Sequence, residues 1–247
     1  MSLALKSSSG PAPWFTTTHW SIVLLARDGD TSIAFGALER LCRDYWRPVH
    51  AYVRRDGYSP ADAQDLTQEF LSRFVHKEWL NHLKDQRGKF RSFLLTFLKH
   101  FLSDERDRAG ALKRGGGATV IPLDELEAEE QGALGVLEAL TADQVFERRW
   151  AQDVIDRTTA QLRREYIENG KADLYAELKD LQPGEHTSGG YAEIGARLRL
   201  TESAVKSAMH RMRQRHRALL RAEIARTVSS EAEIDAEIRY LISVLGS

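Results

Sequence analysis

A basic stretch in the C-terminal third of the chain, LTESAVKSAMHRMRQRHR (residues 200–217), carries side chains that could bind a polyanion. Successive residues of a helix are 100° apart, so a helix here would have one apolar face. That face would hold Val205, Ala208, Met209, Met212 and His216. Hydrogen-bond donors and cations would cover the other faces, at Ser203, Lys206, Ser207, His210, Arg211, Arg213, Gln214, Arg215 and Arg217. A helix that packs through one stripe and presents donors elsewhere is typical of nucleic-acid binding.

The segment YAEIGARLRLTESAVKSA, which leads into this helix, has the spacing of a helix-turn-helix. The apolar positions of such a unit would be Ile194, Leu198, Leu200, Val205 and Ala208. Gly195 is small where the two helices must cross closely, and Thr201 is a suitable N-cap for the second helix. Arg199 falls at the turn position that often needs a left-handed backbone, at a cost of about 1 kcal/mol.

In a helix-turn-helix, the N-terminal part of the second helix enters the major groove of DNA. The residues expected to meet base edges are Lys206, Ser207, His210 and Arg211, and those expected to meet phosphates are Arg213, Arg215 and Arg217. The alternative is an ordinary helical hairpin with a solvated basic face, but spacing, cap and charge together favour DNA binding. No metal site is expected, because His210 and His216 lie on opposite faces without cysteine or acid at ligand spacing.

The segment DAQDLTQEF would form an acidic ridge on a helix in the first half of the chain. Asp62, Asp65 and Glu69 follow one another at steps of three and four, with Gln68 adjacent, so they share one helical side. Such a ridge indicates either simple solvation or a basic partner, and we favour the partner. Thr67 lies near the ridge, and its phosphorylation would add about 1.5–2 negative charges there.

The segment KDQRGKFRSFLLTFLKHFLSDERDR combines a basic loop, aromatic residues and a basic helix. Aromatic pockets beside cations hold unstacked bases of single-stranded nucleic acid. Phe93, Phe97 and Phe101 are spaced as a core stripe, whereas Phe90 stands at the end of the loop and is a candidate for base contact.

Charge is segregated along the chain, although the formal net charge is only −1. Residues 87–114 carry eight Lys and Arg against three acids, and residues 197–221 carry eight against one. Residues 123–147 hold eight acids and no base. The sequence thus predicts two basic blocks separated by an acidic spacer.

The composition, with 42% hydrophobic residues, is that of a folded protein with a substantial core. The single Cys42 cannot form an internal disulfide, which suits a reducing cytoplasm, and it is expected to pack in the core. No apolar run approaches the ~18 residues of a membrane span. The segment MSLALKSSSGPAP lacks the apolar core of a signal peptide, so we expect a cytoplasmic location and a disordered N-terminal tail.

Helical periodicity dominates, so the expected fold is all-α, with two small helical domains joined by a flexible acidic linker. Ser59 is a suitable N-cap with Pro60 at the first helical position, and helices should resume at about Thr141 after the linker. The apolar face of residues 231–245 should pack against another element. The expected divisions are a tail (1–15), a first domain (16–114), the linker (115–140), a helix-turn-helix domain (141–222) and a C-terminal helical extension (223–247).

In their order along the chain, DAQDLTQEF, RGKFRSFLLTFLKHFLSDERDR and YAEIGARLRLTESAVKSAMHRMR resemble the extracytoplasmic-function (ECF) type of alternative sigma factor. The likeness covers roughly residues 16–225, and the ordered set is more specific than any single motif. The resemblance implies a sigma region 2-like bundle followed by a sigma region 4-like helix-turn-helix. It also implies a promoter-recognition subunit that is not an enzyme and needs no cofactor.

Further expectations about partners follow from the resemblance alone. The β′ clamp helices of bacterial core RNA polymerase would bind the acidic helix at Asp62, Gln64, Asp65, Gln68 and Glu69. The −10 promoter element would be melted and bound by Lys84, Gln86, Arg87, Lys89, Phe90, Arg91, Lys99, His100, Arg106 and Arg108. The −35 element and the β flap would meet the second domain, with DNA contacts from Ser203, Lys206, Ser207, His210, Arg211, Arg213, Gln214 and Arg215. Regulation would come from an anti-sigma factor, from a kinase acting near the acidic ridge or from the C-terminal tail of the chain itself.

The chain departs from the family pattern at several places. Gln64 stands where glutamate is usual and His100 where asparagine is common, while residues 147–180 are longer than usual and residues 223–247 are additional. The alternative function is a stand-alone helix-turn-helix regulator whose residues 16–112 form a sensor or dimerisation domain. An enzyme ranks third, because the sequence shows no phosphate loop, nucleophile motif or metal-ligand cluster.

Overall fold

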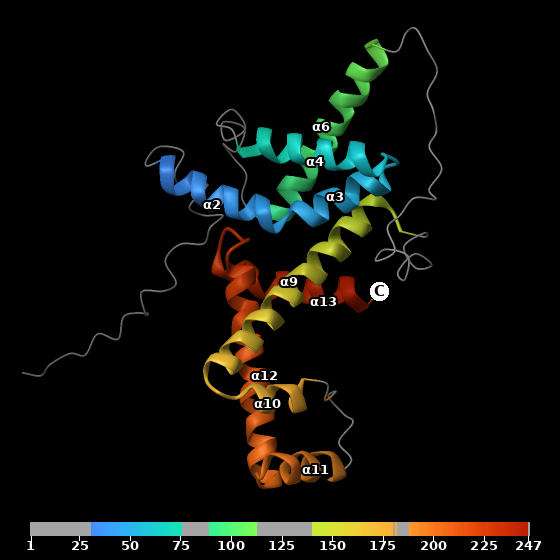
Figure 1. Ribbon diagram of the computed structural model, residues 1–247. Helices are drawn as coiled ribbons and strands as arrows, with labels where there is room; N and C mark the ends of the chain where they lie inside the picture. Colours follow the sequence, from blue (N-terminus) through green and yellow to red (C-terminus); the bar gives the residue numbers. More distant parts are fainter. Residues whose placement is uncertain (1–30, 76–88, 113–139, 180, 182–187, 247) are drawn as a thin grey trace, which may run out of the picture.

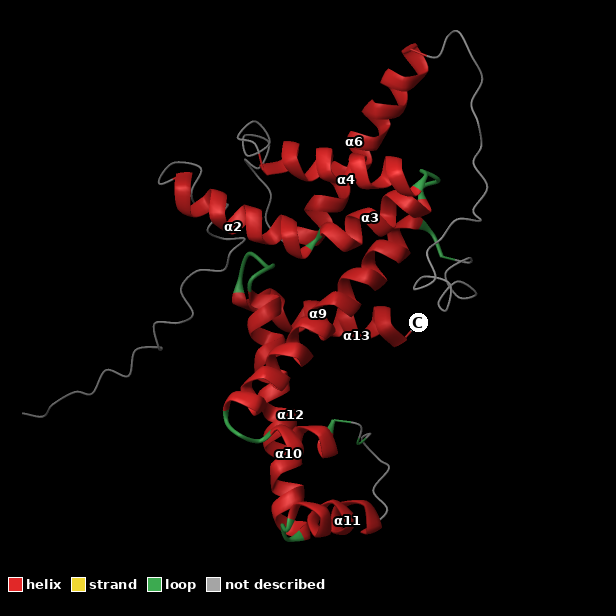
Figure 2. Ribbon diagram, viewed as in Figure 1, coloured by secondary structure: helices red, strands yellow, loops and turns green. Residues whose placement is uncertain are grey.

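The computed structural model describes residues 31–75, 89–112, 140–179, 181 and 188–246, and these are helical almost throughout (Figures 1 and 2). The α-helices are α2 (Thr31–Asp44), α3 (Trp46–Arg55), α4 (Pro60–Val75), α6 (Phe90–Leu112), α9 (Ala142–Glu168), α10 (Ala172–Leu178), α11 (Ser188–Leu198), α12 (Glu202–Ala225) and α13 (Ile234–Gly246). A 3₁₀ helix, η4 (Glu231–Glu233), precedes α13. Within the described residues strand pairing is limited to an isolated antiparallel bridge between Lys89 and Val228. The all-α prediction is confirmed.

Three helices begin with a side-chain N-cap, and two of these caps, Ser59 and Thr201, are the predicted ones. The Asp62 amide donates to Ser59 Oγ at 3.1 Å, with Pro60 as the first residue of α4. Thr141 and Gln144 form a reciprocal capping box at the start of α9. The Ala204 amide donates to Thr201 Oγ1 at 3.2 Å at the start of α12. In each case a side-chain oxygen satisfies an amide that the helix itself leaves unpaired, so these boundaries follow from local sequence.

The larger core lies where α2, α3, α4 and α6 meet, in the upper part of Figure 1. Its centre is aromatic: the Tyr45 and Phe90 rings meet edge to face at 5.0 Å, and Phe70 packs on Phe101 at 5.5 Å. Cys42 is buried among these helices, as expected. The core does not end with α6, because it continues through Phe146, Trp150, Val154, Ile224, Val228, Ile234 and Leu241 of the later segments.

The later helices therefore pack on the earlier ones. In Figure 1, α9 leaves the underside of α3 and runs beside α12, with α13 crossing next to them. The Arg55 guanidinium donates to the Leu140 carbonyl at 2.7 Å, and Arg47 meets Asp153 at 3.4 Å. The expected linker lies outside the described residues except for Leu140. Helices on both sides of it share one core, whereas the sequence suggested two domains held apart by a tether.

A second, smaller core lies at the far end of the α9–α12 pair, where α10 and α11 pack on α12. Its buried residues are Leu178, Tyr191, Ile194, Val205, Ala208 and Met209. Ile194, Val205 and Ala208 were expected in a helix-turn-helix core, and that prediction is confirmed. Leu200 was expected there too, but its side chain is 41% exposed. It precedes the N-cap in the turn, where its side chain is free to point outward.

The turn between α11 and α12 is a close crossing with a left-handed residue. A methyl group added at Gly195 would lie 2.6 Å from the Leu200 carbonyl oxygen, closer than any side chain tolerates. Arg199 has a φ of 56°, in the left-handed region, and the Leu200 amide donates to the Gly195 carbonyl at 2.8 Å. Both predictions for this turn are confirmed, and the glycine is needed for the close approach of the two segments.

We predict that Gly195→Ala destabilises the protein by about 1–3 kcal/mol, because the added methyl group must displace backbone rather than a flexible side chain. Gly190→Ala, in the same helix, is the matched control, since nothing lies within 4 Å of its added methyl group. Urea unfolding of both variants measures the difference. Equal unfolding midpoints for the two variants would contradict the close crossing.

Candidate nucleic-acid interface

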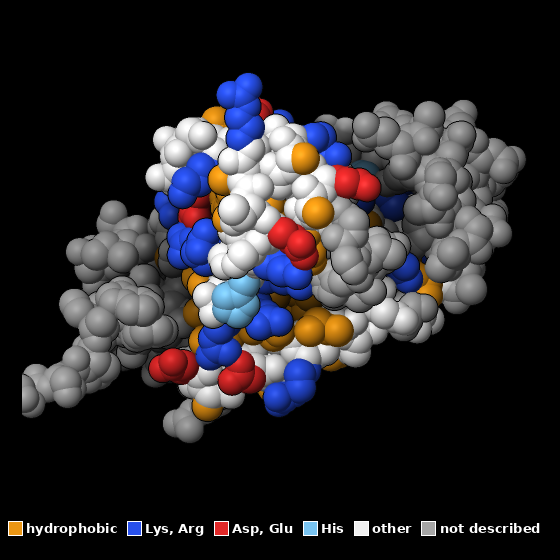
Figure 3. All heavy atoms as spheres, turned by 90° about the horizontal axis from the view of Figure 1, so that it is seen from below, with side chains coloured by type: hydrophobic (Ala, Val, Ile, Leu, Met, Phe, Trp, Pro, Cys, Tyr) orange, Lys and Arg blue, Asp and Glu red, His pale blue; other side chains and the backbone are white. Residues whose placement is uncertain are grey.

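The N-terminal half of α12 presents the predicted donors to solvent. Ser203, Ser207, His210, Arg211 and Gln214 are all exposed, while Val205, Ala208 and Met209 face inward. Figure 3 looks onto this end of the molecule, where Lys and Arg side chains gather around a histidine. The donor face and the packing face are therefore separated as the 100° periodicity predicted.

Lys206 is exposed but has partners on its own surface. Its ammonium lies 2.6 Å from Glu202 Oε1 one turn earlier and 5.8 Å from the centre of the Tyr191 ring. Exposed pairs of this kind contribute only about 0.3–0.5 kcal/mol. A polyanion could therefore replace Glu202 as the partner of Lys206 at little cost in free energy.

Farther along α12, the expected phosphate contacts face α9 in part. Arg215 forms two hydrogen bonds of 2.7 Å with the carboxylate of Glu165, and they hold the pKa of Glu165 below its usual value. Arg213 is half-buried, whereas Arg217 is exposed. Arg215 would therefore have to give up its ion pair with Glu165 before it could meet a phosphate.

His216 packs against α9, as its place on the apolar face predicted. Its Nε2 lies 3.3 Å from Thr158 Oγ1 and 3.5 Å from Thr159 Oγ1. Burial lowers the pKa of His216, so the neutral imidazole is favoured in the folded protein. This histidine contributes to packing rather than to the donor face.

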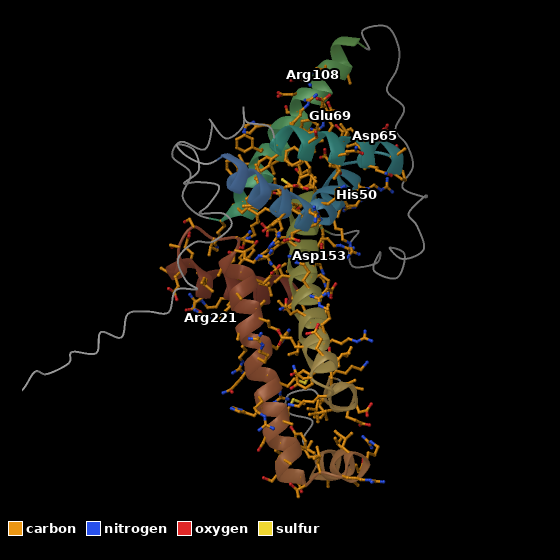
Figure 4. The ribbon with its side chains drawn as sticks, turned by 60° about the vertical axis from the view of Figure 1, so that its left-hand side comes forward. His50, Asp65, Glu69, Arg108, Asp153 and Arg221 are labelled. Atoms are coloured by element: carbon orange, nitrogen blue, oxygen red, sulfur yellow. The ribbon has the colours of Figure 1, made fainter. Side chains whose placement is uncertain are left out.

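The acidic ridge on α4 is present as a surface feature. All five predicted residues are exposed on this helix: Asp62, Gln64, Asp65, Gln68 and Glu69. Asp65 and Glu69 are labelled in Figure 4. Glu69 pairs with Arg73 on the same helix, and Arg73 also reaches Glu105 of α6 at 3.0 Å. Asp62 and Asp65 thus lie toward the N-terminal end of the ridge. Glu69, at its other end, is in an ion pair with Arg73.

Thr67 does not lie on this ridge. Its side chain is fully buried, on the face that also carries Ala63, Phe70 and Phe74. Positions 63, 67, 70 and 74 recur at helical spacing, so this threonine belongs to the apolar stripe of α4. A kinase would have no access to the Thr67 hydroxyl in this conformation, and the prediction of a surface phosphorylation site is wrong for it.

Three of the predicted −10 contacts, Lys84, Gln86 and Arg87, lie outside the described residues. Phe90 is fully buried between Tyr45 and Phe74, with ring distances of 5.0 and 5.9 Å. Its assignment as a base contact is therefore wrong for this conformation. Phe90 is the first residue of α6 and lies on the same helical face as Phe93 and Phe97. It therefore belongs to their apolar stripe.

Arg91 is also buried, at 5% exposure, within a group of side chains that we term the Arg91 cluster. Its Nε lies 2.5 Å from Glu237 Oε1 of α13, and its Nη1 lies 2.5 Å from Glu147 Oε1 of α9. The guanidinium also stacks 4.0 Å from the centre of the Tyr240 ring and 5.0 Å from that of Trp150. The members of the cluster are Lys89, Arg91, Glu147, Trp150, Glu237 and Tyr240.

The remaining predicted −10 residues on α6 lie on the surface, three of them in ion pairs. Lys99 meets Asp143 of α9 at 2.5 Å, and Arg106 pairs with Asp56. Arg108 pairs with Glu105, and His100 is exposed. The carboxylate of Glu105 thus serves two arginines, as expected for an exposed helical surface. Among the described residues, no group of three or more His, Cys, Asp or Glu could hold a metal ion.

The acids that neutralise the basic residues, above all Glu237, Glu147 and Glu165, were not predicted from the sequence. One signal was available for Glu237. It lies three residues after Ile234 and four before Leu241, both buried, so it falls within the apolar stripe of α13. An acid in such a stripe indicates a buried basic partner. The expectation that this helix packs against another element is confirmed.

Comparisons of the chain with protein-family models, with curated proteins and with solved structures find no match. In the described part of the chain, no helix has the length and apolar character required to cross a membrane.

We predict that Arg91→Met destabilises the protein by about 3–5 kcal/mol, because Glu237, only 1% exposed, would lose its main buried partner. Arg221→Met is the matched control, since it breaks an exposed pair with Asp235 and should cost at most about 1 kcal/mol. Urea unfolding distinguishes the two. A small effect of Arg91→Met would show that Lys89 alone compensates Glu237.

Proposed function

We propose that this chain is an alternative sigma factor of the extracytoplasmic-function type, which binds core RNA polymerase and directs it to promoters. It would supply sequence recognition and strand binding, while the polymerase would supply the chemistry. The observation that carries the proposal is the helix-turn-helix: a close glycine crossing, a left-handed turn residue and an exposed donor face on α12. The order of the sequence motifs along the chain favours a sigma factor over other classes of helix-turn-helix protein.

The exposed ridge on α4 supports the same proposal from the other end of the chain. Five polar residues lie on one helix with their side chains in solvent, and the two outermost acids, Asp62 and Asp65, are free of the Arg73 pair. Such a surface suits a basic partner. If the chain is a sigma factor, this partner is the pair of β′ clamp helices.

A stand-alone helix-turn-helix regulator is the second candidate, and the shared core favours it. A sensor domain packed directly on the helices that carry a DNA-binding unit would share a core with them, as α2, α3, α4 and α6 do here with α9, α13 and the end of α12. A regulator of this kind would bind a symmetric duplex as a dimer, without polymerase. A sigma factor would need polymerase and an asymmetric site with two elements.

The first test mixes the purified chain with sigma-free bacterial core polymerase and measures co-elution. We expect binding, and a loss of affinity of at least tenfold in Asp65→Lys, because the reversal places a cation on the acidic ridge. Glu168→Lys, an exposed acid at the end of α9, controls for the change in net charge. Failure to bind core, together with tight binding to a symmetric duplex, would favour the regulator.

The second test measures binding of the polymerase-bound chain to the promoter fragments that give run-off transcripts. Arg211→Ala should weaken binding by about 1–3 kcal/mol on these fragments and less on random DNA, because a base-edge contact is lost. Arg43→Ala, an exposed arginine on α2, is the control. Equal losses on both kinds of DNA would assign Arg211 to phosphate rather than base contact.

A further inference from the structure

The start of α6 is covered by segments from the end of the chain. The Phe90 amide donates to the Thr227 carbonyl at 2.9 Å, and Lys89 pairs with Val228 in the isolated antiparallel bridge. Val228 is fully buried at this contact. The backbone entering α6 is thus held by the segment that follows α12.

The side chains at the same place are neutralised by the same region. Glu237 of α13 meets Lys89 Nζ at 2.7 Å and Arg91 Nε at 2.5 Å, and Tyr240 covers the Arg91 guanidinium. Lys89 and Arg91 are among the cations that the resemblance to sigma factors assigns to promoter DNA. The Glu237 carboxylate thus lies between these two cations and accepts hydrogen bonds from both.

Beyond the Arg91 cluster, α13 packs less completely against the neighbouring helices. A hollow of about 360 Å³ lies between α6, α9 and α13, lined among others by Leu95, Leu140, Tyr240 and Val244. Ile242 is 60% exposed, and the pair between Asp235 and Arg221 lies on the surface. Ile234, Glu237 and Leu241 of α13 are buried, while Ile238, Tyr240, Val244 and Leu245 are only partly buried against the core.

We propose that α13 and the 227–228 segment form an intramolecular clamp, which holds the start of α6 closed and must release before Lys89 and Arg91 can bind DNA. This inference rests on the proposed function for the identity of the DNA. The competition is between like ligands, because the Glu237 carboxylate and a DNA phosphate are both anions that accept hydrogen bonds from the same cations. Polymerase and promoter DNA would have to supply the free energy that opens the clamp.

The test is a reversible lock, Lys89→Cys with Val228→Cys in the full chain. The Phe90–Thr227 hydrogen bond makes Lys89 and Val228 a non-hydrogen-bonded pair, whose Cα atoms in antiparallel strands lie about 4.5 Å apart, within the range of a disulfide. Cys42 should not interfere, because it is buried and burial raises the pKa of its thiol.

Oxidised and reduced forms of this variant are compared for run-off transcription with core polymerase. The reference is Lys89→Cys alone, because Lys89 is itself an expected DNA contact. We expect oxidation of the double variant to lower transcription at least tenfold below this reference, and dithiothreitol to restore it, since the oxidised form cannot open. Equal activity of the oxidised, reduced and reference forms would overturn the clamp. Each form is also tested for co-elution with core, which reports on the proposed function separately.

A second measurement does not require polymerase. Glu237→Gln removes the competing charge, and it should increase binding of the full chain to a random single-stranded DNA of about 15 nucleotides by roughly fivefold at low salt. Asp235→Asn, on the same helix but in a surface pair, should bind like the parent chain. If Glu237→Gln is folded by circular dichroism and binds no better than Asp235→Asn, the clamp is wrong. An increase without any binding to core would retain the clamp and reject the sigma factor.

Discussion

A buried guanidinium determines how the described parts of this chain fit together. A charge as deeply buried as that of Arg91 is tolerated only when opposite charges and hydrogen bonds surround it. Those partners come from α9 and α13, more than fifty residues downstream. The first turn of α6 can therefore be buried only when both later helices are in place. The aromatic contacts of Trp150 and Tyr240 complete the same site.

Features governed by local chemistry could be predicted from the sequence. The caps at Ser59 and Thr201 need only a side-chain oxygen before a helix, and the Gly195 crossing needs only the absence of a Cβ atom. The burial of Thr67 was also accessible, because helical spacing places it with Ala63 and Phe70. The nearby acids indicate an exposed ridge, but they lie on the other face of the same helix.

Features that depend on contacts between distant segments could not be predicted in this way. Periodicity identified α6 as amphipathic, but it could not say that α13 would cover its first turn. The donor face of α12 was correctly placed, yet Arg215 lies against Glu165, fifty residues earlier in the chain. A basic residue in sequence is equally suited to a phosphate or a carboxylate, and only the fold shows which one is near.

Acids from distant parts of the sequence lie beside the basic residues of α6, in a chain whose formal net charge is −1. Acids from α9 and α13 neutralise Arg91, and Asp143 at the start of α9 meets Lys99. The described part of α6 therefore presents a weaker positive potential than its sequence suggests, while the first half of α12 keeps its donors in solvent. Under the proposed function, long-range attraction to DNA would begin at α12, because its first half is less covered by acids than the described part of α6.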